Sequence, residues 1–246
     1  MIIAITVLSI ILIGVGFIVT ENNANQLLTG YNTMPEEERQ KFDIKSYITY
    51  FRNFHIFLGI SLFVIGFFLY YFIDSDWSGI FMGTYPILAY VYFIWKSNKF
   101  SKQDDKKQNR KALIAMGIMI VVFTSIVFMF YSSLKDNSIE MNNQMINIQG
   151  DFGIDLKTNE VKSVELVNNL PNITSKVNGF ALETILKGYF KTDDGEKVKL
   201  LINSDKKPVI LITTTKDQKI YYSSKDRSNA EIYSELQKVI GNKNFR

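Results

Sequence analysis

Long apolar runs fill the first half of the chain, and short alternating segments fill the second. About 20 mainly apolar residues are needed for a helix to cross a bilayer, where each backbone amide must find a partner within its own segment. The pattern predicts four transmembrane helices in residues 1–134 and a separate domain over residues 138–246. The four runs, which contain no Asp, Glu, Lys or Arg, cover residues 2–19, 54–73, 79–95 and 112–131.

Two of the four runs admit another interpretation. Residues 2–19 have the length of a cleaved signal peptide, although no basic segment precedes them and no clear cleavage site of small residues follows. Residues 79–95 contain Pro86 and several aromatic residues, which would also suit a re-entrant or interfacial segment. Four crossing helices are the expectation, with these two alternatives left open.

The basic residues of the connecting segments indicate an orientation. Residues 20–53 and 96–111 are rich in Lys and Arg, whereas the turn 74–78 has neither. Short cytoplasmic loops of membrane proteins carry such an excess. Both basic loops are therefore expected in the cytoplasm of a multi-pass cell-membrane protein, with the N-terminus and the C-terminal domain outside. The cluster Lys96–Lys111 fits this topology signal better than a nucleic-acid or phosphoinositide site, and no nucleic-acid partner is expected.

The first cytoplasmic loop is the most distinctive stretch of the helical half. From Leu27 to Asp43 it reads LLTGYNTMPEEERQKFD. Turn residues come first, and Thr33 and Glu36 then have the spacing of a helix capping box. Apolar residues next recur at helical spacing as far as Phe51, which predicts an amphipathic helix that lies at the membrane surface and runs into the second span.

This loop and the runs around it resemble the DUF3784 family of small bacterial membrane proteins over residues 1–95. That family typically has a GYNTM-x-x-EE-like motif followed by an aromatic residue and an Asp; here Pro35 stands where Ser is expected. The family is uncharacterised, so the resemblance implies a membrane location but no activity. The first six motif residues either bind a ligand or form a turn and cap that direct the next helix. The matching residues are Gly30, Tyr31, Asn32, Thr33, Met34 and Glu37, followed by Glu38, Phe42 and Asp43.

From Ser138 onward, period-two alternation and turn residues predict seven or eight antiparallel strands. An amphipathic helix from Ser228 to Gly241 follows, with Glu231 at the capping-box position. This order predicts a small barrel or bent sandwich closed by one helix. The expected strands are Gln144–Gln149, Phe152–Leu156, Val161–Val167, Ile173–Val177, Ile185–Lys191, Lys197–Asn203, Val209–Thr214 and Lys219–Ser223.

The order of these elements resembles the bacterial pleckstrin-homology (PH-like) domains, in which an NGF-type turn precedes a GxF strand. The fold class is therefore expected to be a multi-domain membrane protein, with a four-helix transmembrane bundle followed by a mainly-β PH-like barrel. In that turn, Phe180 would either reach a membrane or partner or plug the domain from inside. The candidate binding residues are Asn178, Gly179, Phe180, Lys187, Gly188 and Tyr189, and Lys176, Lys187, Lys191, Lys197 and Lys199 are candidates for one shared face.

Composition narrows the chemistry further. The chain has no Cys and a single His, His55, which excludes Cys-based sites and argues against a His-based metal site or triad. It also contains none of the common nucleotide-binding, hydrolase or metal-loop motifs. We therefore expect a non-enzymatic protein with no catalytic residue, metal or cofactor.

The expected partners are the lipid bilayer and another membrane protein or a secreted peptide, with peptide immunity or envelope stress as the process. A transporter component and an enzyme built on the loop motif are the alternatives. His55 itself is expected to pack at a membrane interface rather than to relay protons.

Overall fold

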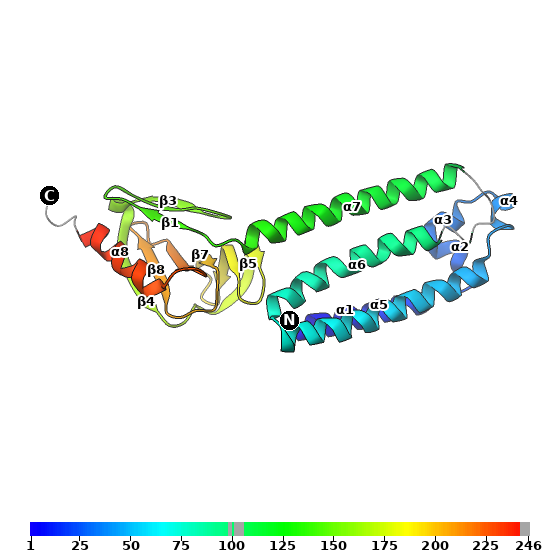
Figure 1. Ribbon diagram of the computed structural model, residues 1–246, viewed down its shortest axis with the longest axis horizontal. Helices are drawn as coiled ribbons and strands as arrows, with labels where there is room; N and C mark the ends of the chain where they lie inside the picture. The colour runs from blue at the N-terminus through cyan, green and yellow to red at the C-terminus, as the bar shows by residue number, and fades with distance from the viewer. Residues whose placement is uncertain (98–99, 101–105, 242–246) are drawn as a thin grey trace. The chain divides into compact units, whose positions relative to one another are not determined.

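The computed structural model describes residues 1–97, 100 and 106–241 (Figure 1). Its internal contacts divide the chain into two compact units, Met1–Val127 and Phe128–Arg246. The boundary falls inside the last long helix of the first half, so the C-terminal unit contains the final two turns of that helix. We call Met1–Val127 the helical unit and Phe128–Arg246 the β unit.

Seven helices precede the first strand among the described residues. The predicted surface helix and the second apolar run form one continuous helix, α5, whose N-terminus is capped by Asp43, with its side chain accepting a hydrogen bond from the Ser46 amide at 3.1 Å. The helices are α1 (Ile2–Ile18), α2 (Ala24–Leu27), α3 (Thr29–Asn32), α4 (Glu36–Arg39), α5 (Ile44–Phe72), α6 (Ser75–Ser97) and α7 (Lys106–Leu134).

Three of these helices are long and apolar enough to cross a membrane by length and composition: α5, α6 and the segment Arg110–Leu134 of α7. The apolar helix α1 has 17 residues and is shorter than these three. These helices have the character of a membrane protein. Pro86 lies inside α6, which continues past it to Ser97.

Helix α1 packs along α5 through glycines. A Cβ atom added at Gly59 would lie 2.5 Å from the Ile13 side chain and 2.7 Å from the Ser9 carbonyl oxygen. Gly66 meets Ile5 in the same way, with 3.2 Å to the nearest methyl carbon. Small residues at helix interfaces let backbones approach closely in membranes, where packing replaces the hydrophobic driving force.

The β unit, as far as it is described (residues 128–241), contains nine strands in two sheets. Sheet one is β1-β2-β3, and sheet two has the order β4-β8-β9-β7-β6-β5. All neighbours are antiparallel except β7 and β9, which run parallel, so the expectation of purely antiparallel strands is wrong at this pair. The strands are β1 (Ile139–Met141), β2 (Met145–Ile148), β3 (Ile154–Lys157), β4 (Val161–Val167), β5 (Ile173–Ala181), β6 (Leu186–Thr192), β7 (Lys197–Ile202), β8 (Val209–Thr214) and β9 (Lys219–Ser223).

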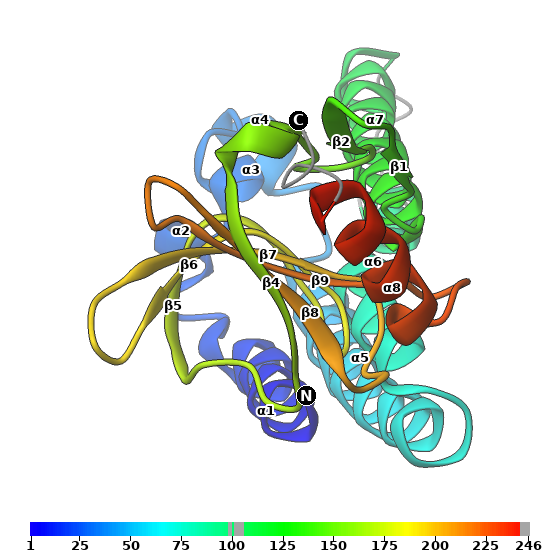
Figure 2. The same cartoon turned by 90° about the vertical axis from the view of Figure 1, so that its left-hand side faces the viewer.

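The parallel pair has a topological cause. After β7 the chain enters β8 and returns in β9, which inserts between β7 and β8 instead of pairing at the outside of β8. Strand β9 therefore runs antiparallel to β8 on one side and parallel to β7 on the other. The predicted C-terminal helix is present as α8 (Asn229–Gly241), which packs along β4 and β8 (Figures 1 and 2).

The larger sheet buries apolar side chains on both faces. One core lies among this sheet, the small sheet and α8, and its centre includes Leu201, Ile212, Tyr222 and Leu236. The opposite face holds a second cluster formed by Phe190 of β6 with residues of β7, β8 and β9, and Leu170 from the β4–β5 connection packs against it. Burial on both faces explains why β7 and β8 read as nearly continuous apolar runs.

Candidate functional site

The six candidate residues of the β unit form three neighbouring cross-strand pairs of the β5–β6 hairpin. Asn178 opposes Tyr189, Gly179 opposes Gly188, and Phe180 opposes Lys187; the structure thus brings all six together. The expected loop around Phe180 is wrong, because β5 continues to Ala181.

Two facing glycines allow β5 to continue through this point. A Cβ atom at Gly188 would lie 2.3 Å from the Asn178 carbonyl oxygen, and one at Gly179 would lie 2.2 Å from the Lys187 carbonyl oxygen. Gly188 also has a φ of +123°, which L side chains rarely adopt. The register shift between Lys176 and Asn178 accompanies this close approach.

The third pair is turned toward the end of α7. The Phe180 ring contacts Phe130 edge to face, with 5.8 Å between ring centroids, and only 9% of Phe180 is exposed. Lys187 is 1% exposed, and its ammonium group donates a hydrogen bond to the Lys135 carbonyl directly after α7. Phe180 is therefore a buried packing residue, which was one of its two expected roles.

A polar network joins the end of α7 to the sheets, and we call it the α7 joint. The hydroxyls of Ser132 and Ser133 donate to the two carboxylate oxygens of Asp151, each at 2.8 Å. Three residues after Ser133, the Asp136 carboxylate accepts a hydrogen bond from the Ser224 hydroxyl at 2.5 Å. The joint consists of Ser132, Ser133, Lys135, Asp136, Asn137, Asp151, Lys187, Asn203, Tyr222 and Ser224.

Asn137 is the centre of this network and is fully buried. Its side-chain amide donates to the carbonyls of Gln149 and Asp151, at 2.8 and 3.0 Å. Its backbone N–H donates to the Asn203 side chain at 3.1 Å, and its carbonyl accepts the Tyr222 hydroxyl at 2.7 Å. One residue therefore connects the end of α7 to the β2–β3 turn, to β9 and to the residue after β7.

Burial changes the ionisation of the joint. Desolvation lowers the pKa of Lys187 from 10.5 to about 8, and the negative charges of Asp151 and Asp136 oppose that shift. Burial also raises the pKa of the Tyr222 hydroxyl, which keeps it protonated as a donor. At neutral pH the joint thus contains one buried cation between carboxylates.

Four of the five candidate lysines share one face of β6 and β7. Lys191 opposes Lys197 and Tyr189 opposes Lys199, while Lys187 lies on the same face two residues before Tyr189. The Lys197 and Lys199 ammonium groups lie 4.6 and 5.0 Å from the centroid of the Tyr189 ring.

Only part of this lysine face is open to solvent. Lys199 is 4% exposed and donates to the Gly153 carbonyl at 3.1 Å, whereas Lys191 and Lys197 are exposed. Lys176 opposes Phe190, whose side chain belongs to the other face.

In the helical unit, the loop motif surrounds Arg39, a residue that sequence reasoning did not single out. Its guanidinium donates to the carbonyls of Asn32 and Met34, at 3.3 and 3.2 Å. It also lies over the Tyr31 ring at 5.6 Å from the centroid, and it pairs with Glu36 at 3.5 Å. The only sequence signal for this role was a cation three residues after an acid on a short helix.

The other motif residues complete a compact turn. Gly30 lies within α3, Thr33 follows its last residue, and Glu37 is an exposed residue of α4. Tyr31 packs on Phe42 with 5.5 Å between ring centroids and borders the apolar cluster of Val19, Ala24 and Ile48. Of the two roles considered for the motif, these contacts favour a structural turn that directs α5, rather than a site that binds a ligand.

Residues 6–101 match the family model described as Domain of unknown function (DUF3784). The match confirms the resemblance for the helical part of the chain, and its description names no activity. Comparisons with curated proteins and with solved structures found no match.

Inside the DUF3784 region, three side-chain hydrogen bonds link α5 to α6. His55 is buried, its Nδ1 lies 2.7 Å from the Phe51 carbonyl oxygen, and its Nε2 lies 3.0 Å from the Tyr90 hydroxyl. Nδ1 therefore carries the proton, and Nε2 accepts from Tyr90. Further along, Ser61 pairs with Tyr85 at 2.6 Å and the Ser78 hydroxyl donates to the Gly66 carbonyl at 2.7 Å.

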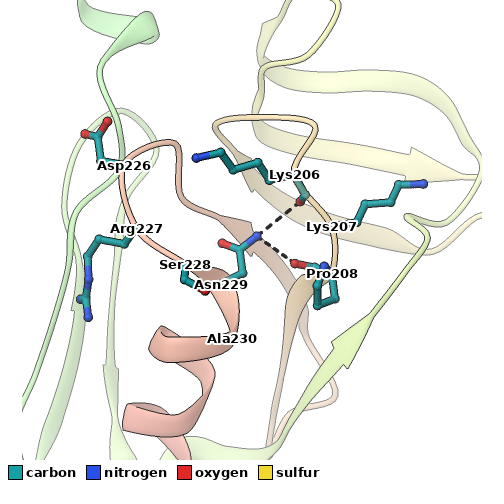
Figure 3. Close-up of a pocket in the computed structure, with 8 residues that line it drawn as sticks. All are labelled: Lys206, Lys207, Pro208, Asp226, Arg227, Ser228, Asn229 and Ala230. Atoms are coloured by element: carbon teal, nitrogen blue, oxygen red, sulfur yellow. Dashed lines mark hydrogen bonds between the residues drawn. The ribbon is translucent and has the colours of Figure 1, made fainter.

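Outside the DUF3784 region, a cavity of about 420 Å³ lies beside the start of α8 (Figure 3). The Asn229 amide donates to the Pro208 and Lys206 carbonyls, at 2.8 and 3.3 Å. The cations around it are engaged elsewhere, because Lys206 donates to the Lys225 carbonyl and Arg227 pairs with Glu235, both at 2.6 Å. The lining residues are Lys206, Lys207, Pro208, Asp226, Arg227, Ser228, Asn229 and Ala230.

No group of three or more His, Cys, Asp or Glu that could hold a metal ion occurs within the described residues.

Proposed function

We propose that this chain is a membrane-anchored binding protein, which holds its β unit at the membrane surface for interaction with another protein or a secreted peptide. The single observation that carries the proposal is the α7 joint. It holds the last turn of α7, a helix of membrane-spanning length, against the sheets through hydrogen bonds that begin at Ser132.

Helix α1 is proposed as a fourth span beside α5, α6 and α7. Its 17 mainly apolar residues reach the lower end of the length needed to cross, and its glycine contacts along α5 support the proposal. With the basic loops in the cytoplasm, four spans put the N-terminus and the β unit outside. With three spans the β unit also stays outside, because α5, α6 and α7 alone fix its side.

The β unit is proposed to be a PH-like domain of bacterial type. Its run of strands followed by the single helix α8 supports this, and the parallel β7–β9 pair departs from the expected pattern. The enzyme alternative built on the loop motif is weakened because Arg39 occupies the Asn32 and Met34 carbonyls. A transporter would need a polar path, whereas the three polar links between α5 and α6 are satisfied within the helix pair.

Orientation can be tested with engineered cysteines, since the chain has none of its own. Single variants Ser75→Cys, Gln103→Cys and Ser204→Cys are treated in intact cells with a membrane-impermeant maleimide. The proposal expects labelling at positions 75 and 204 and protection at 103 until the cells are opened. Labelling of Ser204→Cys only after opening would contradict an external β unit.

The binding role is tested separately in cells that are challenged with any membrane-active secreted peptide found to be encoded beside this chain. Deleting the chain should raise sensitivity to that peptide, and restoring it should return resistance. The matched control is a chain that lacks α8 but still inserts into the membrane. Because its β unit has lost one wall of the core, it should not restore resistance. Unchanged sensitivity after deletion would reject the immunity version of the proposal.

A further inference from the structure

The end of α7 is bonded to the β unit in more directions than attachment alone requires. Asp151 holds two successive hydroxyls, of Ser132 and Ser133, from one side of the helix end. Lys187 holds the Lys135 carbonyl from a different strand, and Tyr222 holds the Asn137 carbonyl from a third. Bonds from three separate segments resist rotation of the helix about its own axis as well as bending at its end.

Lys187 is the unexpected member of this set. A buried ammonium group is costly, and replacing buried charges with apolar side chains of similar size is often neutral or stabilising. Packing alone would therefore be served as well by Met at this position. What an apolar side chain cannot supply is a directional bond to a carbonyl at the C-terminal end of a helix, where a positive charge is also favoured by the helix dipole.

We infer that Lys187 fixes the orientation of the last two turns of α7, Phe128–Leu134, against the sheets of the β unit. The charged groups around this lysine are Asp151 from the β2–β3 turn and Asp136 from the segment after α7. Lys187 is a positioning residue in this scheme, and its contribution is to geometry rather than to the free energy of unfolding.

A matched control exists on the same face of the sheet. Lys199 is also buried and also donates to a backbone carbonyl, that of Gly153, but it makes no bond to the end of α7. The substitutions Lys187→Met and Lys199→Met therefore remove the same kind of buried charge. Only the first removes a bond of the α7 joint.

The experiment measures the distance distribution between two spin labels in the full-length chain in lipid nanodiscs. The labels are attached at Phe128→Cys and Val177→Cys, positions that are 70% and 51% exposed and lie in α7 and β5. The inference expects one narrow distribution in the parent, at least a twofold broader one with Lys187→Met, and no change with Lys199→Met. The thermal midpoint of Lys187→Met should be equal to or above that of the parent.

Two results would overturn the inference. The first is a broad distribution in the parent chain, and the second is an unchanged width in Lys187→Met. If that variant does not fold, the double substitution of Ser132 and Ser133 by Ala removes two joint bonds without touching the sheet. It should broaden the distribution as well, and an unchanged width there counts equally against the inference.

Discussion

The helical unit and the β unit both bury polar side chains, but they connect them differently. Between α5 and α6, single pairs such as His55 and Tyr90 link one helix to its neighbour. In the α7 joint, Asn137 alone bonds to three segments that are distant in sequence. The comparison teaches that a helix pair can lose one link and keep its packing, whereas the joint depends on several segments being in place at once.

Glycine gives a second contrast between the units. Gly59 admits a neighbouring helix, and the atoms that a Cβ would meet include the flexible Ile13 side chain. Gly188 admits a neighbouring strand, and the atoms in the way are backbone. A strand held by ladder hydrogen bonds on both sides has less freedom to shift than a helix in lipid, so we expect the larger penalty in the sheet.

The largest effect is expected for Gly188→Ala. The methyl group would meet the Asn178 carbonyl at 2.3 Å, and alanine would also have to adopt a φ of +123°. We expect the free energy of unfolding of the β unit to fall by about 3 kcal/mol. Gly195→Ala is the control, since Gly195 has a positive φ but nothing within 4 Å of its added Cβ. Chemical denaturation followed by the circular dichroism of the β-strands measures the free energy of unfolding of both variants. An equal loss of stability in the two variants would show that the close approach at Gly188 is unimportant.

The second-largest loss of stability is expected for Gly59→Leu, which tests the close approach of the two helices α1 and α5 in the helical unit. The side chain would force α1 away from α5 at Ser9 and Ile13, at a cost of about 2 kcal/mol. Gly14→Leu in α1 is the control, because nothing lies within 4 Å of its added Cβ. Unfolding in mixed detergent micelles should separate the two variants, and an equal stability of both would contradict the glycine-mediated packing.

Sequence patterns predicted the elements that depend on local spacing. The bounds of β4, β8 and β9 agree with the alternation, and α8 begins within one residue of the expected cap. The three-residue strand β1 was missed because it is too short to show a period. The extension of β5 to Ala181 was missed because Gly179 was interpreted as a turn, whereas it serves a close approach to β6.

The α7 joint could not be predicted in the same way. Lys187 and Lys135 are 52 positions apart, and Ser224 and Asp136 are 88 apart, so no local pattern connects them. Lys187 was predicted as a binding candidate from its place in a hairpin motif, whereas its burial against α7 depends on tertiary packing. Arg39 in the loop motif shows the same limit, since its partners are backbone carbonyls that have no sequence signature.

A smaller effect is expected from the pH dependence of the β unit. Because the pKa of Lys187 is about 8 in the folded chain and 10.5 when exposed, the unfolded chain binds more protons between these values. Stability therefore rises with pH in that window, by about 1 kcal/mol between pH 8 and pH 9 from this group. Thermal unfolding of the parent and of Lys187→Met at both pH values measures it. The variant should lose this gain, and a parallel response of both chains would reject a buried, titrating Lys187.

The smallest effect is expected where a single link between helices is cut. Tyr90→Phe keeps the ring in the aromatic cluster with Phe54 and Phe93 and removes only the hydroxyl that faces His55 Nε2. Side-chain hydrogen bonds between membrane helices contribute about 0.6 kcal/mol on average, so a loss of that order is expected in micelle unfolding. Tyr92→Phe on the same helix, whose side chain is 48% exposed, should cost less. A loss well above that of Ser132→Ala in the α7 joint would reverse the comparison, because it would make the isolated pair the more cooperative of the two arrangements.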